Sequence, residues 1–116
     1  MILDNIVQSK DDFMNLLKEN PGHIVIKFGA DWCRPCKAIK PIVDEFFNTS
    51  NNSIYCIDVD IDESLDLFGF LKTKRIVNGV PAILVYKAGN EHYIPDDSVL
   101  GGNMDEVRLL FERITN

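Results

Sequence analysis

The sequence contains few cysteines, fewer basic than acidic residues and no long unbroken run of apolar residues. Three cysteines in 116 residues are too few, and odd in number, for the disulfide framework of a small secreted protein, so we expect a reducing, cytoplasmic setting. The net charge of -6 disfavours nucleic acid and anionic lipid as partners. Residues 1–20 contain no apolar run of signal-peptide length, and no segment is long and apolar enough to span a membrane.

Hydrophobic residues are plentiful, at 46% of the chain, and charged residues make up 26%. This composition is typical of a globular protein. Because a chain of 116 residues is about one domain long, we expect a single domain over residues 1–116.

Strand and helix patterns alternate along the chain. Apolar, β-branched and aromatic runs predict strands over residues 2–7, 24–28, 54–60, 82–86 and 91–94, the last as a hairpin partner of the one before it. Apolar residues at helical spacing predict helices from about 9 to 20, from 36 to 47, over 64–72 and from 103 onward. The order predicts an α/β fold in which a central mixed sheet of about five strands lies between about four helices.

Two cysteines separated by two residues, Cys33 and Cys36, lie between a predicted strand and the helix that follows it. Thiol–disulfide exchange needs one thiolate that attacks a disulfide and a second thiol that resolves the mixed disulfide. Backbone N–H groups and the dipole at the helix start favour the thiolate of Cys33, which predicts Cys33 as the nucleophile and Cys36 as the resolving cysteine. A zinc site is disfavoured because only Cys56, His23 and His92 remain as cysteine or histidine ligands, without metal-site spacing. A purely structural pair is the remaining alternative.

The sequence around the two cysteines resembles thioredoxin, and the resemblance spans nearly the whole chain. Residues 30–37 read Ala-Asp-Trp-Cys-Arg-Pro-Cys-Lys, Pro41 lies in the following helix, and residues 79–81 read Gly-Val-Pro before a predicted buried strand. The resemblance implies the thioredoxin fold. It also implies that the protein needs no metal and no bound cofactor, because the cysteine pair is itself the redox centre.

The same resemblance assigns a substrate groove beside the cysteines. It implies that Pro81 follows a cis peptide bond and faces the disulfide, and that Val80 and Gly101 lie beside it in the groove. Trp32 is expected to shield the nucleophile. The alternative for Trp32 is an ordinary core aromatic residue.

The motif departs from the usual thioredoxin at position 34, where arginine replaces glycine. A guanidinium one residue from the nucleophile favours its thiolate, which predicts a disulfide that is more oxidising by roughly 10–20 mV. The alternative is a solvated Arg34 that only adds charge to the docking surface. Pro35 is retained, which indicates a reductase.

A second departure is a lysine in a predicted buried strand. Thioredoxins usually have an acid at the position of Lys27 and a lysine at the position of Asp58, so the pair is expected to be charge-swapped. A buried ammonium without a partner would be very costly, and Asp58 on the next strand is the best candidate. By resemblance the buried acid relays protons to and from the resolving cysteine. Here either Asp58 takes over as base or Lys27 stabilises the Cys36 thiolate.

Residues 62–79 and 89–101 are expected to be longer than in typical thioredoxins and to run toward the groove. Residues 72–75 read Lys-Thr-Lys-Arg. Together with Arg34 and Lys37, this basic cluster predicts a preference for acidic client proteins. The alternative is that the cluster is an ordinary solvated surface with no role in client choice. Cys56, in a predicted central strand, is expected to be a small buried hydrophobic residue.

Taken together, the sequence predicts a monomeric dithiol reductase of protein disulfides. Its partners would be disulfide-containing client proteins and an electron donor of the thioredoxin-reductase type. A disulfide isomerase or oxidase is an alternative, although the usual histidine beside the second cysteine is missing. A thioredoxin-fold binding subunit with incidental thiols is the alternative from another functional class.

Overall fold

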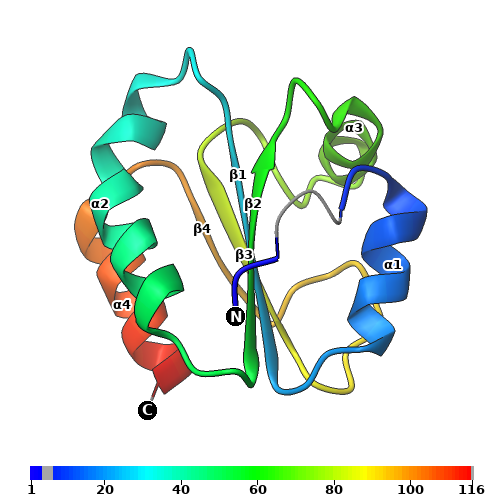
Figure 1. The fold of residues 1–116 in the computed structure, drawn as a ribbon. Coiled ribbons are helices and arrows are strands. Elements are labelled where there is room, and N and C mark those ends of the chain that lie inside the picture. The colour runs from blue at the N-terminus through cyan, green and yellow to red at the C-terminus, as the bar shows by residue number, and fades with distance from the viewer. Residues whose placement is uncertain (4–6, 116) are drawn as a thin grey trace.

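The computed structural model describes residues 1–3 and 7–115, and in them four helices cover the two faces of a four-stranded sheet (Figure 1). The strands β1 (His23–Gly29), β2 (Ile54–Asp60), β3 (Ala82–Lys87) and β4 (Asp97–Leu100) lie in the order β2-β1-β3-β4. β2 is parallel to β1, whereas β3 is antiparallel to both β1 and β4. The helices are α1 (Lys10–Lys18), α2 (Arg34–Thr49), α3 (Leu65–Thr73) and α4 (Met104–Thr115). The predicted α/β fold with a mixed sheet is confirmed.

The central strand β1 supplies both cores of the protein because its side chains alternate between the two faces of the sheet. Ile24, Ile26 and Phe28 pack with α1 and α3 on one face, and Val25 packs with α2 and α4 on the other. The same alternation places Lys27 on the α2 face, at the end of the strand that leads to the cysteines.

The predicted helix starts at Ser9 and Asn103 are both present. The Ser9 hydroxyl accepts a hydrogen bond from the backbone N–H of Asp12, and the Asp12 carboxylate accepts one from the backbone of Ser9, which completes a capping box. The Asn103 side chain accepts from the backbone N–H of Glu106 at 3.0 Å. Local sequence therefore determines where α1 and α4 begin.

Two of the predicted strands differ from the structure or lie partly outside the described residues. Residues 4–6 of the predicted strand 2–7 lie outside the described residues, and Ile2 forms an isolated parallel bridge with Cys56. The predicted hairpin partner 91–94 is wrong, because the strand that pairs with β3 is β4. The Asn90 side chain donates to the carbonyl of Ile94, so residues 90–94 satisfy their polar groups within a loop rather than in a ladder.

The loop between β3 and β4 begins at the end of the sheet opposite to the start of α2 (Figure 1). Lys87 pairs with His23 at the start of β1, whereas the cysteines follow the end of that strand. The Ala88 amide also donates to the carbonyl of Gly22. The expectation that residues 89–101 run toward the groove is therefore wrong for the turn that follows β3. Tyr93 farther along the loop packs against Phe70 of α3, and the segment after β4 returns to the cysteine end.

Candidate functional site

The two cysteines of the motif form a disulfide at the first turn of α2. Cys33 is the N-cap of the helix, and its Cα lies 5.3 Å from that of Cys36. The backbone N–H of Cys36 points at the Cys33 sulfur, with a nitrogen–sulfur distance of 3.2 Å. A helix N-terminus of this kind stabilises negative charge, so in the reduced protein the charge that develops on Cys33 faces the positive end of the helix dipole.

The intervening residues Arg34 and Pro35 occupy the first turn of α2. Proline is favoured there because the N–H groups of the first turn have no partner within the helix. Arg34 is exposed, and none of the ion pairs among the described residues includes it. The guanidinium is therefore free to interact with the thiolate next to it or with a partner.

The segment that leads into β3 lies at the same end of the sheet as the cysteines. The Val80–Pro81 peptide bond is cis, as the resemblance implies. The Pro81 carbonyl accepts a hydrogen bond from the amide of Gly101 at 2.9 Å. Gly101 has φ 111°, a backbone conformation that side-chain-bearing residues rarely adopt. Pro81 and Gly101, which the sequence assigned to one groove, are thus in direct contact.

A glycine that sequence reasoning missed connects this segment to the cysteines. A β-carbon on Gly102 would lie 2.8 Å from Cβ and 3.4 Å from the carbonyl oxygen of Pro35. The loop after β4 therefore packs directly on the first turn of α2, and only glycine fits there without movement. The position of Gly102 just before the Asn103 cap is a weak sequence signal, because it does not reveal the contact with Pro35.

Trp32 is not a core residue, because 67% of it is exposed to solvent. Its indole N–H donates to the Asp62 carboxylate at 3.0 Å, which fixes the ring beside the cysteines. Sequence reasoning missed Asp62, although its place after β2, at the carboxyl end of a strand parallel to β1, was a usable signal.

The predicted pair Lys27 and Asp58 forms an ion pair on neighbouring strands. The two residues are direct partners in the parallel register of β1 and β2, and Lys27 Nζ lies 3.6 Å from Asp58 Oδ1. The lysine side chain is 8% exposed and the aspartate side chain 48% exposed. The positive charge of Lys27 is therefore buried, whereas the negative charge of Asp58 is about half exposed.

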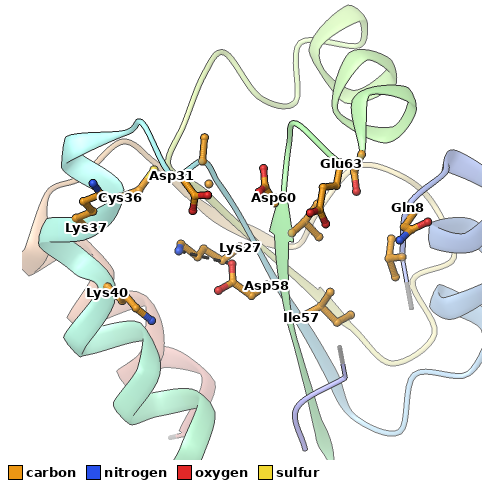
Figure 2. Close-up of a pocket in the computed structure, with 15 residues that line it drawn as sticks. Gln8, Lys27, Asp31, Cys36, Lys37, Lys40, Ile57, Asp58, Asp60 and Glu63 are labelled. Atoms are coloured by element: carbon orange, nitrogen blue, oxygen red, sulfur yellow. Dashed lines mark ion pairs between the residues drawn. The ribbon is translucent and has the colours of Figure 1, made fainter. Parts of the chain in front are cut away.

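A cavity of about 480 Å³ lies against this pair and Cys36 (Figure 2). Figure 2 shows Lys27 extending from β1 toward α2, with the Asp58 carboxylate beside it. Residues from β1, α2, β2 and the adjoining loops line the cavity, among them Lys27, Cys36, Lys40, Asp58, Asp60 and Glu63. Charged groups of both signs thus surround the Cys36 side of the disulfide.

Cys56 is separate from the redox pair. It is fully buried in β2 and its sulfur lies 3.3 Å from the Ser50 hydroxyl. Burial raises the pKa of its thiol, which disfavours the reactive thiolate. It has the environment of the small buried hydrophobic residue that the sequence predicts.

The described residues contain no group of three or more His, Cys, Asp or Glu side chains placed to hold a metal ion. Among the same residues, no helix has both the length and the apolar character needed to cross a membrane.

Comparisons with known proteins agree with this geometry. The Thioredoxin family model matches residues 4–108. Thioredoxin 1 of Plasmodium falciparum is 31% identical over 108 residues, which cover 93% of this chain and 94% of that protein. A chloroplastic M-type thioredoxin of Chlamydomonas reinhardtii is 30% identical over 81 residues, 70% of this chain and 55% of the relative. A solved Plasmodium falciparum thioredoxin matches with a TM-score of 0.71 at 30% identity, over 92% of this chain and 95% of that one.

Proposed function

The chain belongs to the thioredoxin family and is a protein-disulfide oxidoreductase, and from this premise we propose that it acts as a dithiol reductase of protein disulfides. The observation that carries the proposal is the Cys33–Cys36 disulfide at the start of α2. The two sulfurs are close enough to cycle between a disulfide and a dithiol without rearrangement of the helix.

The proposed reaction has two exchange steps. The Cys33 thiolate attacks one sulfur of a client disulfide, a Cys33–client disulfide forms, and the other client sulfur leaves as a thiolate that takes up a proton. Cys36 then loses its proton and attacks the Cys33 sulfur, which forms the Cys33–Cys36 disulfide and releases the second client thiol. Counted from the dithiol, including the proton that Cys33 loses when it forms the thiolate, the chain loses two electrons and two protons and the client gains the same number.

We assign the first step to Cys33 and the groove beside it. Cys33 is the helix N-cap, where its thiolate is stabilised, and Arg34 adds a positive charge next to it. Pro35 keeps the first turn of the helix in place. The groove that receives the client chain is formed by Trp32, Val80, Pro81 and Gly101, and the Pro81–Gly101 hydrogen bond and the Trp32–Asp62 hydrogen bond hold it in shape.

The partners and setting belong to the same proposal. Family members generally reduce disulfide substrates and are reduced by thioredoxin reductase, so we propose a donor of that type and disulfide-containing clients. We also propose that residues 1–116 act as a monomeric single domain, that the cysteine pair is the only redox group, and that the protein works in the cytoplasm. Chloroplastic relatives exist, so fractionation against chloroplast and cytoplasmic markers tests the location.

A trapping experiment tests the reaction. In Cys36→Ser, the mixed disulfide on Cys33 can no longer be resolved, so we expect clients from a cell extract to remain attached as adducts that a reducing agent releases. Cys33→Ser is the matched control and should give no adducts. In parallel, the unmodified chain should accelerate reduction of a disulfide-bonded test protein such as insulin by dithiothreitol.

Each alternative predicts a different result. A binding subunit with incidental thiols would retain its biological activity as Cys33→Ser. An oxidase would introduce disulfides into a reduced client, and an isomerase would rearrange the disulfides of a wrongly paired client, faster than either reduces a disulfide. Absence of adducts together with absence of catalysed reduction would refute the reductase function.

A further inference from the structure

Among the described residues, Lys27 is the one charged side chain that is buried. Lys27 and the resolving cysteine, Cys36, line the same cavity. Lys27 Nζ is 3.3 Å and Cys36 Sγ is 3.5 Å from the point where a β-carbon on Gly29 would sit. Both atoms therefore border the same small space, which Gly29 leaves empty.

Gly29 keeps that space open. Lys27, Gly29 and the Cys36 side of α2 lie on the same face of the sheet, because residues two apart in a strand point the same way. A side chain at position 29 would extend between the ammonium and the sulfur. Glycine at the end of β1 is therefore explained by the space that it leaves for Lys27 and Cys36, and not by its backbone conformation.

Other charges face this space from several elements. Asp58 lies closest to the ammonium, with the 3.6 Å ion pair. The remaining charged groups that line the cavity are Asp31 before α2, Lys37 and Lys40 on α2, Asp60 at the end of β2 and Glu63 after it. Lys40 is paired with Asp44 at 2.7 Å and is exposed, so the charge of Lys27 is the one least screened by solvent near Cys36.

We propose that Lys27, acting through the space left by Gly29, stabilises the thiolate of Cys36 and so drives the resolving step, in place of a carboxylate base. This inference rests on the proposed function and concerns its second step only. Lys27 and Gly29 are positioning residues, because neither exchanges a bond with the client.

In this proposal the resolving step uses the positive charge of Lys27 and needs no base on the chain. When Cys33 carries the client, the proton of Cys36 leaves to solvent through the cavity, and the thiolate that remains faces the Lys27 ammonium. That thiolate attacks the Cys33 sulfur, and the electron pair of the Cys33–client bond leaves with the client sulfur. The ammonium keeps its protons throughout, so the step needs no proton acceptor on the chain.

The expected effect can be bounded from the distances. A unit charge roughly 5–7 Å from a thiolate, at an effective dielectric of about 20, shifts the proton equilibrium of the thiol by roughly one to two pH units. The Asp58 carboxylate offsets part of that effect. We therefore expect loss of the ammonium to raise the midpoint pH of the resolving step by about one unit. The thiolate fraction at neutral pH then falls about tenfold, and the rate falls about threefold to fourfold because a more basic thiolate is a better nucleophile.

Stopped-flow reaction of the reduced chain with a chromogenic aromatic disulfide tests this inference. The first thiolate released reports attack by Cys33, and the second reports resolution by Cys36. In Lys27→Met, which keeps the stem but removes the charge, the second phase should slow about threefold to fourfold at pH 7 and its midpoint should rise by about one unit. Gly29→Val should shift the midpoint in the same direction, and Lys27→Arg should restore it.

Asp58→Asn distinguishes the two possible roles of the pair, which are stabilisation of the Cys36 thiolate by Lys27 and removal of the Cys36 proton by Asp58. If Lys27 stabilises the thiolate, removal of the Asp58 carboxylate, which offsets the charge of Lys27, should leave the second phase equally fast or faster. With Asp58 as base, the same change slows it. Lys40→Met removes a lysine from the same cavity wall and should leave the midpoint unchanged, as the matched control.

The inference is overturned if Lys27→Met leaves the midpoint where it was, if it slows both phases equally, or if Asp58→Asn slows the second phase. Urea denaturation of each oxidised variant shows whether it is folded. Failure of the proposed function is a separate result, since it appears as absent client adducts in the Cys36→Ser trap whatever the pH profile of Cys36.

Discussion

The contact between Gly102 and Pro35 predicts that a single methyl group will destabilise the active-site end of the molecule. A β-carbon on Gly102 would lie 2.8 Å from Pro35 Cβ, a separation that real β-carbons essentially never show. Because the second contact is the backbone carbonyl of Pro35 at 3.4 Å, the loop has to move away from α2. We expect Gly102→Ala to lower the free energy of unfolding by about 1–3 kcal/mol, as overpacking does elsewhere.

The assay is urea denaturation of the oxidised chain, in which the midpoint should fall by on the order of 1 M. Gly69→Ala is the matched control, because nothing lies within 4 Å of its would-be β-carbon inside α3. That variant should gain about 0.5–1 kcal/mol, since alanine is the better helix former. A further test is Pro35→Gly, which removes the clashing β-carbon, so Gly102→Ala should cost less in that background. Equal stability of Gly102→Ala and the unmodified chain would refute the argument.

Three further predictions concern charges and a helix cap. Arg113 donates to Asp97 at 2.7 and 3.2 Å, and this bonding lowers the pKa of the Asp97 carboxyl. The stability that this pair contributes is therefore present above the ordinary carboxyl pKa and is lost as the pH falls through the lowered value. In urea denaturation, Arg113→Gln should have a lower free energy of unfolding than the unmodified chain at pH 7, and the same free energy well below pH about 4. Arg34→Gly should make the disulfide less oxidising by roughly 10–20 mV in a redox titration, and an unchanged midpoint would mean that Arg34 is only solvated charge. Ser9→Ala should cost about 1 kcal/mol in urea denaturation, because it removes the capping bond to Asp12, whereas Ser9→Asp should keep most of the stability.

Local chemistry explains which parts of the fold the sequence predicted correctly. The caps at Ser9 and Asn103 and the cysteine pair before α2 are signals contained within a few neighbouring residues. The Lys27–Asp58 pair was also predictable, because a lysine in an apolar strand demands a partner and the parallel neighbour supplies one.

The errors and omissions have two origins, one local and one that depends on distant segments. Residues 91–94 contain apolar side chains that suit a strand, yet Pro95 follows and the Asn90 and Asp96 side chains take up the nearby backbone groups. β4 begins only after them, where Val99 faces the core. The spaces at Gly29 and Gly102 depend on α2 packing against β1 and on the loop after β4, which no local pattern reveals.

The loop between β3 and β4 has a practical consequence for handling the protein. Its turn at Ala88 and Gly89 is exposed and lies at the far end of the sheet from Cys33. Exposed loop tips are the sites that best accept inserted peptides. An affinity handle inserted after Gly89 would immobilise the chain on a resin or an electrode with its disulfide directed outward, so client capture and electrochemistry could be measured on one oriented layer.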